Sequence, residues 1–162
     1  MIDTIYKDLL GQLDSRVPDL RWIDYDQGQI DYPAEHYPID FPAVLIDFEN
    51  TDWEDLGRQI QGGDITIGFR VAFRLYEDLN NHTPADSRNA GLQKLQLLTT
   101  IHKALQGFAG ANYNRLSRIR TFTEKRNDGL KVIVMQYATY LIDESAMTTV
   151  EQKVDNLDVQ KG

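Results

Sequence analysis

The chain has 162 residues, of which 41% are hydrophobic, and this is enough for one domain with a buried core. Its net charge of −8 argues against general or specific binding to nucleic acid, because such binding draws affinity from neutralised phosphates. The sequence has no cysteine, which excludes disulfides, thiol nucleophiles and cysteine-based zinc sites. No apolar run approaches the roughly 18 residues of a membrane span, and the N-terminus does not resemble a signal peptide, so we expect a soluble protein made in the cytoplasm.

The first part of the chain predicts a helix, a short ribbon and a loop. Ile2, Ile5, Tyr6, Leu9, Leu10 and Leu13 recur at helical spacing, which predicts an amphipathic helix over residues 2–14 that Pro18 closes. Residues 21–25 are typical of a short strand, and Gly28 predicts a turn before residues 29–32, so the two segments are expected to form a small ribbon. Three prolines between residues 33 and 42 favour an irregular surface loop. We interpret residues 24–40 as an insertion.

The next part predicts two strands. Residues 43–49 are nearly continuously apolar, as in an inner strand, whereas the glycines of residues 50–63 favour a mobile connection. Residues 65–76 alternate with a period of two, which predicts a long central antiparallel strand. Arg70 and Arg74 lie on the polar face of this strand, so we expect a helix to cover the other face. An unpaired guanidinium beneath a helix would be costly.

The last part predicts a helix, a hairpin and a tail. Asp86 or Ser87 is expected to cap a helix that ends near Gln106 and forms the main cover of the sheet. Residues 117–123 and 130–142 predict a hairpin, and both faces of its second arm are apolar, which favours burial of one face against another molecule. The predicted fold class is α+β, an antiparallel sheet of about four main strands with two helices on one face. We expect one domain over residues 1–144 and a flexible acidic tail over residues 145–162.

No catalytic group stands out in the sequence. His36, His82 and His102 are far apart and have no ligand-like neighbours, and His102 is interpreted as a core or edge histidine. Asp47 and Glu49, with Asp52 nearby, could bind a divalent cation, but a solvated acidic loop explains them better. We therefore predict neither a metal site nor a cofactor.

Charge divides the chain into unlike parts. Residues 1–60 carry 14 acidic and 4 basic groups, and residues 61–142 carry 6 acidic and 11 basic groups. The basic groups of the last hairpin are Arg115, Arg118, Arg120, Lys125, Arg126 and Lys131. This cluster could contact DNA phosphates, pair with an acidic protein surface or simply be solvated, and we favour contact with protein. Trp53 lies outside the predicted core, as interface aromatics do.

The sequence resembles the tail terminator, or tail-completion, proteins of long-tailed bacteriophages and related prophages. The resemblance covers about residues 2–143. It rests on the N-terminal helix, Phe41-Pro42-Ala43-Val44-Leu45-Ile46, Arg70-Val71-Ala72-Phe73, Ile101-His102-Lys103-Ala104-Leu105-Gln106-Gly107 and the hairpin from Arg120-Thr121-Phe122 to Tyr137. These are matches of element order and hydrophobic pattern.

The resemblance implies a non-enzymatic virion protein at the tail-neck junction, assembled in the host cytoplasm. Such a protein forms a ring, commonly a hexamer, that ends the tail tube and receives the head connector, so its partners are copies of itself, the tube protein and the connector. Another head-tail joining protein is the nearest alternative, and a small metal-dependent hydrolase or nuclease is the alternative from a different class. On this interpretation Arg70 and Arg74 face the ring channel or an adjoining subunit, and replacing both with glutamate is expected to leave the isolated fold intact.

Overall fold

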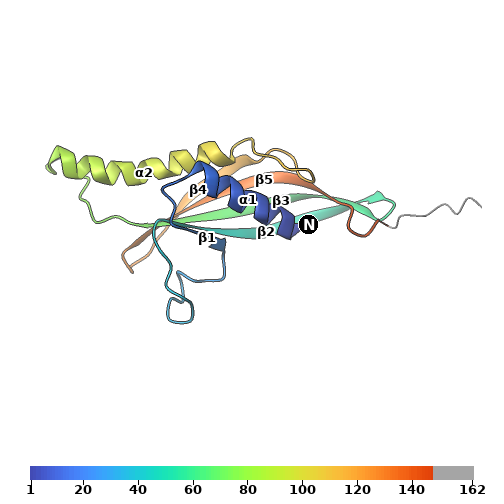
Figure 1. Cartoon of the computed structure of the whole chain (residues 1–162), viewed down its shortest axis with the longest axis horizontal. Coiled ribbons are helices and arrows are strands. Elements are labelled where there is room, and N and C mark those ends of the chain that lie inside the picture. Colours follow the sequence, from blue (N-terminus) through green and yellow to red (C-terminus); the bar gives the residue numbers. More distant parts are fainter. Residues whose placement is uncertain (148–162) are drawn as a thin grey trace, which may run out of the picture.

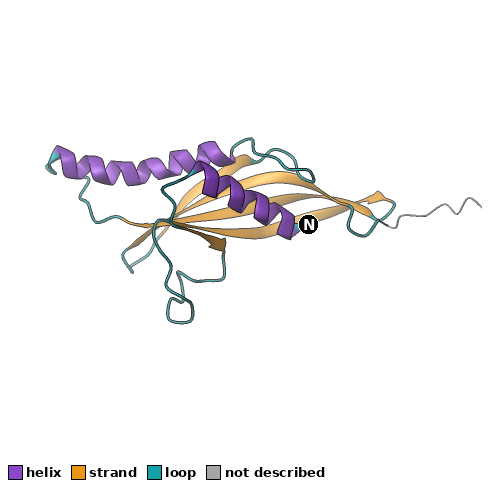
Figure 2. Ribbon diagram, viewed as in Figure 1, coloured by secondary structure: helices purple, strands orange, loops and turns teal. Residues whose placement is uncertain are grey.

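The computed structural model describes residues 1–147, which form a five-stranded sheet with two helices on one side (Figures 1 and 2). The elements in chain order are α1 (Ile2–Arg16), β1 (Trp22–Tyr25), β2 (Ala43–Gly57), β3 (Ile60–Arg74), α2 (Ala85–Leu105), β4 (Ser117–Glu124) and β5 (Leu130–Asp143). Across the sheet the order is β1-β2-β3-β5-β4, and of these pairs β1 with β2 is parallel while the others are antiparallel. The predicted α+β class is confirmed, with a mixed, mostly antiparallel sheet. No helix within residues 1–147 is long and apolar enough to cross a membrane.

The main core lies between the helices and one face of the sheet. The face of β3 that alternation predicts to be covered is buried, with both Phe69 and Phe73 at most 2% exposed. Helix α1 buries Ile5, Leu9 and Leu13 there, one residue per turn on a single stripe. The prediction that the helices cover this face of β3, and not the face of Arg70, is confirmed.

Helix α2 ends at Leu105 with Gln106 as C-cap, as predicted, but it differs from its prediction at the N-terminus. It begins at Ala85 with Pro84 as N-cap, and neither Asp86 nor Ser87 caps it, because the proline presets the backbone angle and its carbonyl accepts from Arg88. Its C-terminal half buries Leu97, Ile101, Ala104 and Leu105, whereas its N-terminal half is largely exposed and extends beyond the sheet (Figure 1). Helix α2 is therefore not the main cover by itself, because α1 shares that role.

Residues 50–63 form a strand hairpin, so the predicted mobile connection is wrong. Strand β2 continues to Gly57, β3 begins at Ile60, and a two-residue turn with positive φ at both positions joins them. The glycines that suggested mobility have a packing reason. A side chain at Gly62 would collide with the hydroxyl of Tyr140, and one at Gly63 would lie 2.9 Å from the carbonyl oxygen of Asp52.

Residues 26–42 cover part of the second face of the sheet. The predicted ribbon is absent, since β1 pairs with β2 and residues 29–32 form a turn that places Ile30 against Leu45, Ala72 and Val132. The second apolar face of β5 is thus buried near Val132 by its own chain rather than by another molecule. Farther along β5 this face opens, and Ile142 is 41% exposed.

Candidate assembly interface

The sheet has two free edges that lie at opposite ends of its strand order. Strand β1 pairs with β2 at Ala43 to Ile46, and the amide of Asp26 donates to the carbonyl of Ile46, so within residues 1–147 the outer edge of β2 is unpaired beyond that point. Strand β4 is the other edge, and its side chains are exposed along almost its whole length, while the amide of Arg118 near its start donates to the side chain of Gln106 at 3.0 Å. Unpaired strand edges present rows of backbone donors and acceptors to a further strand.

The free half of β2 is acidic and projects beyond the helices as part of the hairpin (Figure 1). Residues 47–64 contain six acidic side chains and one basic side chain. The acidic side chains bond along the sheet surface: Gln136 donates to Glu49 at 2.6 Å, and the Tyr140 hydroxyl donates to Glu54. Asp52 and Trp53 are exposed. The structure thus brings the predicted acidic candidates Asp47, Glu49 and Asp52 together with Trp53 along one edge.

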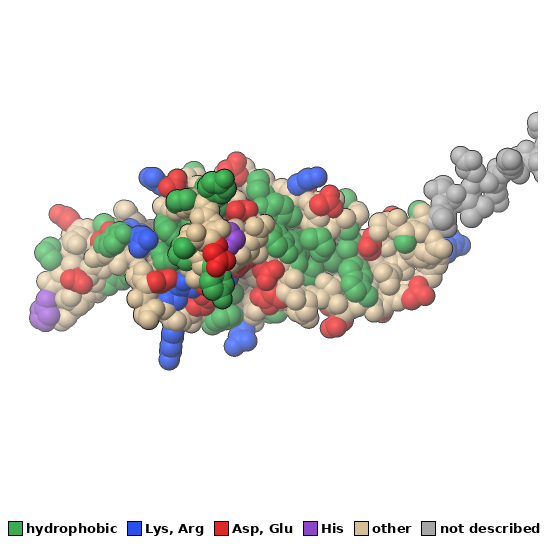
Figure 3. Space-filling view, turned by 90° about the horizontal axis from the view of Figure 1, so that it is seen from below, with side chains coloured by type: hydrophobic (Ala, Val, Ile, Leu, Met, Phe, Trp, Pro, Cys, Tyr) green, Lys and Arg blue, Asp and Glu red, His purple; other side chains and the backbone are tan. Residues whose placement is uncertain are grey.

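The β4 edge has the opposite charge. Arg118 and Arg120 lie on this strand, and Arg115 and Lys125 flank it, all four exposed. Exposed apolar side chains lie between these cations, with Ile119 57% and Phe122 37% exposed. The guanidinium of Arg120 stands 4.9 Å from the centre of the Phe122 ring. Figure 3 shows the sheet face that points away from the helices, where hydrophobic side chains lie among acidic and basic ones.

Arg70 does not point to a neighbour, and this part of the sequence interpretation is wrong. Its side chain is 14% exposed, and the guanidinium bonds to Asp26 at 2.9 Å, to Asp31 at 2.9 Å and to Glu124 at 2.8 Å. Burial opposes its charge, but the bonds to Asp31, Glu124 and Asp26 outweigh burial and raise the pKa of Arg70. These carboxylates come from loop 26–42 and from the end of β4, so Arg70 fastens both to the central strand.

Arg126 belongs to the same network, which separates it from the basic cluster of the hairpin. Its side chain, 13% exposed, bonds to Asp31 and Asp128, and it donates to the carbonyl of Ile30 at 2.6 Å. The sequence could have suggested this network, since Asp26 and Asp31 lie in the segment interpreted as an insertion. It could not show that this segment folds back over Arg70.

The network should weaken in acid. Hydrogen bonds from Arg70 hold the pKa of Asp31 below its ordinary value, and bonds from Arg126 do the same for Asp128. A lowered folded-state pKa gives stability above the unfolded-state value of about 4 that is lost as the pH falls through the folded-state value. In urea unfolding, Asp31→Asn should therefore destabilise the protein at pH 7 and much less at pH 3. As a control, Asp86→Asn changes an exposed carboxylate and should have little effect on the free energy of unfolding at either pH. An equal loss of stability from Asp31→Asn at pH 7 and at pH 3 would contradict the role of the Asp31 carboxylate in the network.

The histidines and carboxylates do not assemble a metal site in the described chain. His102 is partly buried and its Nδ1 lies 2.9 Å from the Tyr137 hydroxyl, as expected for a histidine at the core edge. Burial, with a smaller effect of Arg118, lowers the pKa of His102. Within residues 1–147 no three His, Asp or Glu side chains lie close enough to hold a cation. The hydrolase alternative gains no supporting arrangement from this region.

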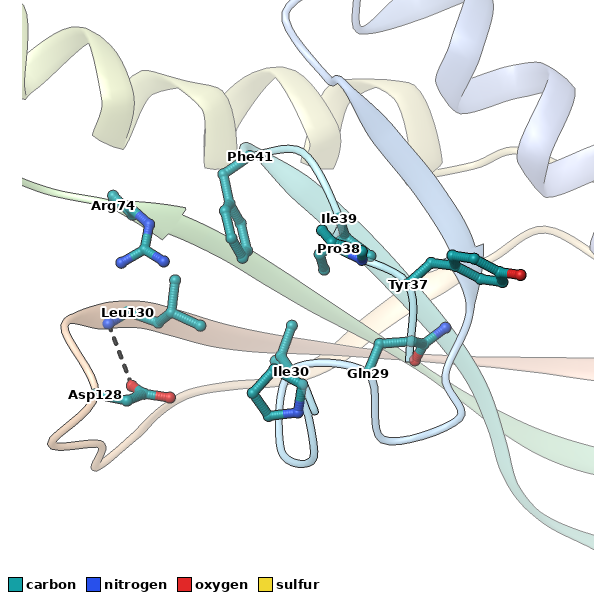
Figure 4. Close-up of a pocket in the computed structure, with 10 residues that line it drawn as sticks. Gln29, Ile30, Tyr37, Pro38, Ile39, Phe41, Arg74, Asp128 and Leu130 are labelled. Atoms are coloured by element: carbon teal, nitrogen blue, oxygen red, sulfur yellow. Dashed lines mark hydrogen bonds between the residues drawn. The ribbon is translucent and has the colours of Figure 1, made fainter. Parts of the chain in front are cut away.

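Arg74 lies where two cavities meet. One cavity, of about 250 Å³, lies under loop 26–42, and Figure 4 shows Phe41, Ile39 and Ile30 facing into it, with Arg74 at its edge. The other, of about 560 Å³, extends toward α2 and shares Phe41 and Arg74 with the first. The Arg74 guanidinium stands 5.3 Å from the centre of the Phe41 ring.

Comparison with known proteins gives a similarity of fold. No protein-family model and no curated protein matches the sequence. Among solved structures, a chain described as "Virion of native gene transfer agent (GTA) particle" matches with a TM-score of 0.44 and 9% sequence identity. The match covers 86% of this chain and 92% of that chain.

Proposed function

We propose that the protein is a structural, non-enzymatic component of a phage-like virion, a tail terminator that forms a ring on the end of the tail tube. In this role it stops tube polymerisation and provides the attachment surface for the head connector at the tail-neck junction. The sequence resemblance over residues 2–143 supports this function. The observation that carries it is the pair of free sheet edges with opposite charge.

A ring requires a head-to-tail contact, in which one surface meets a different surface of the next copy. Strands β2, β3, β5 and β4 alternate in direction, so β4 runs opposite to β2. The β2 edge of a similarly oriented copy placed beside β4 is antiparallel to β4 and extends the sheet. Because each copy carries both edges, the contact can repeat until a ring closes.

The two edges are staggered along the strand direction. When the strand register is followed from β4 across β5 and β3 to β2, Ser117 lies in the same row as Asn50, and Glu124 lies in the same row as Ala43. The free part of β2, however, begins only at Asp47. Pairing therefore shifts each copy along the strands, and a closed sheet with such a shift has tilted strands. On the face away from the helices, Arg120 of one copy then approaches the acidic side chains of the next.

Charge reversal tests this contact. Arg120→Glu and Asp52→Arg each reverse an exposed charge on one edge, and each should raise the protein concentration needed for ring assembly by about tenfold. The combined variant has opposite charges at every contact again and should restore assembly. Light scattering and electron microscopy of negatively stained samples, each with and without tube protein, measure the outcome.

The matched control is Asp86→Arg, an equally exposed reversal in the first turn of α2, which should leave assembly unchanged. Assembly should also weaken with salt, because the screening length is only about 10 Å at 0.1 M. A protein that stays monomeric at every salt and protein concentration, even with tube protein, would contradict the proposal. A ring that does not bind the tube would favour another head-tail joining role.

A further inference from the structure

The two cavities that meet at Arg74, together named the groove, have an apolar end under loop 26–42 and a mixed polar and apolar end beside α2. The smaller cavity is lined mainly by apolar side chains, among them Ile30, Ile39 and Leu130. The larger one is lined by Tyr76 and Pro42 and by charged side chains, whereas Phe73 and Leu97 at its wall are almost fully buried. Phe41 and Arg74 line both, so an extended segment that passes over them can place side chains in each cavity.

Side chains of both charges line the groove: Arg21, Arg74 and Lys94 are basic, and Asp19, Glu77 and Asp128 are acidic. No carboxylate of residues 1–147 lies within ion-pair distance of Arg74 or of Arg21, which also lines the larger cavity, whereas Lys94 nearby pairs with Glu77 at 2.8 Å. Tyr37 is 89% exposed beside the smaller cavity, and Tyr76 is 76% exposed beside the larger one. Exposed tyrosine and arginine side chains are typical of protein contacts.

From these features we infer that the groove binds residues 157–159 of a second copy of this chain. This segment reads Leu157-Asp158-Val159, an apolar, an acidic and an apolar residue in sequence. The Asp158 carboxylate complements Arg74, and an apolar side chain beside it, Leu157 or Val159, suits the smaller, mainly apolar cavity. The inference rests on the proposed function, because that function brings copies side by side.

Chain length favours a second copy over the same one. The smaller cavity is at Leu130, where β5 begins, and the tail leaves from the other end of β5 at Asp143. At about 3.3 Å per residue, the 13 steps between these residues span about 43 Å. The 11 steps from Met147 to Asp158 span at most about 40 Å when fully extended. The segment would therefore reach its own groove only when fully extended back along β5, and this ordering costs conformational entropy that a nearer groove on a neighbouring copy does not.

Disulfide cross-linking tests the inference, since the natural chain has no cysteine to interfere. One full-length chain carries Gln93→Cys, at the wall of the larger cavity, and a second full-length chain with a size tag carries Gln160→Cys. Mild oxidation of the assembled mixture should give a covalent pair of unlike chains. Thr99→Cys, also exposed on α2 but outside the groove, should give about tenfold less in place of Gln93→Cys.

Charge exchange shows whether the cross-link reports binding in the groove. Adding Arg74→Glu to the Gln93→Cys chain should lower the yield about tenfold, and adding Asp158→Lys to the other chain should restore it. Rings that form without this cross-link overturn the inference and leave the proposed function standing. A chain with both cysteines that closes on itself as a monomer also overturns the inference. A specific cross-link between copies that form no ring supports the groove and contradicts the proposed function.

Discussion

Replacing Arg70 with methionine is expected to lower the free energy of unfolding by about 3 kcal/mol, which is typical of removing one partner from a largely buried ion pair. Methionine keeps the length and apolar stem of the side chain, so the change removes mainly the guanidinium. The carboxylates of Asp26, Asp31 and Glu124 then lose their central cation, and the Asp26 side chain is only 11% exposed. Urea unfolding followed by circular dichroism, at a salt concentration that keeps the chain monomeric, measures the loss.

The matched control is Arg74→Met, two positions along the same face of β3. Arg74 has no carboxylate partner within residues 1–147, so its replacement should change the free energy of unfolding by less than about 0.5 kcal/mol. Adding Asp31→Asn to Arg70→Met should recover part of the loss, because it removes one of the repelling carboxylates. Equal stability of the two methionine variants would show that the network does not hold the loop.

Replacing Phe69 with alanine is expected to lower the free energy of unfolding by about 3 to 5 kcal/mol. Phe69 is fully buried at the centre of β3 between the sheet and the helices, and its ring meets that of Tyr137 edge to face at 5.5 Å. Alanine would leave a cavity there and remove the aromatic contact. The same urea experiment measures this loss.

Phe122→Ala is the control for this substitution, because Phe122 also lies in a strand but is 37% exposed at the sheet edge. This substitution should lower the free energy of unfolding by less than about 1 kcal/mol, because the Phe122 side chain buries little apolar area. A similar loss for both phenylalanines would mean that the core is not centred on β3. Phe122→Ala should instead affect assembly, because its ring lies under Arg120 on the proposed contact edge.

The alternation and spacing of apolar residues determined most of the fold. A period of two over residues 65–76 identified the central strand and its covered face, because successive side chains on a strand point to opposite sides. Helical spacing likewise located α1 and α2, and the apolar runs near the C-terminus located the β4–β5 hairpin. Each of these signals is local, which is why the sequence alone was sufficient.

Signals with two meanings misled the prediction. Gly62 and Gly63 indicated mobility, but in the structure they make room for Tyr140 and for the neighbouring β2 backbone. A glycine can indicate either a flexible backbone or a position with no room for a side chain, and its neighbours in space decide which. Residues 51–53 and 140 pack against these glycines only in the folded sheet. Residues 148–162 lie outside the described residues, so the predicted flexible tail stays a prediction.

For the candidate sites too, the sequence determined some features and the tertiary structure determined others. Sequence alone identified the candidate acidic and basic residues and the face that Arg70 and Arg74 share. Only the tertiary structure decided their partners: Arg70 and Arg126 became fixed by loop 26–42, whereas Arg74 stayed exposed at a groove. The order of the strands also decided that the acidic half of β2 and the basic β4 are opposite free edges. The bonds of Arg70 and Arg126 to loop 26–42 join residues 39 to 96 positions apart, and local sequence patterns do not specify such contacts.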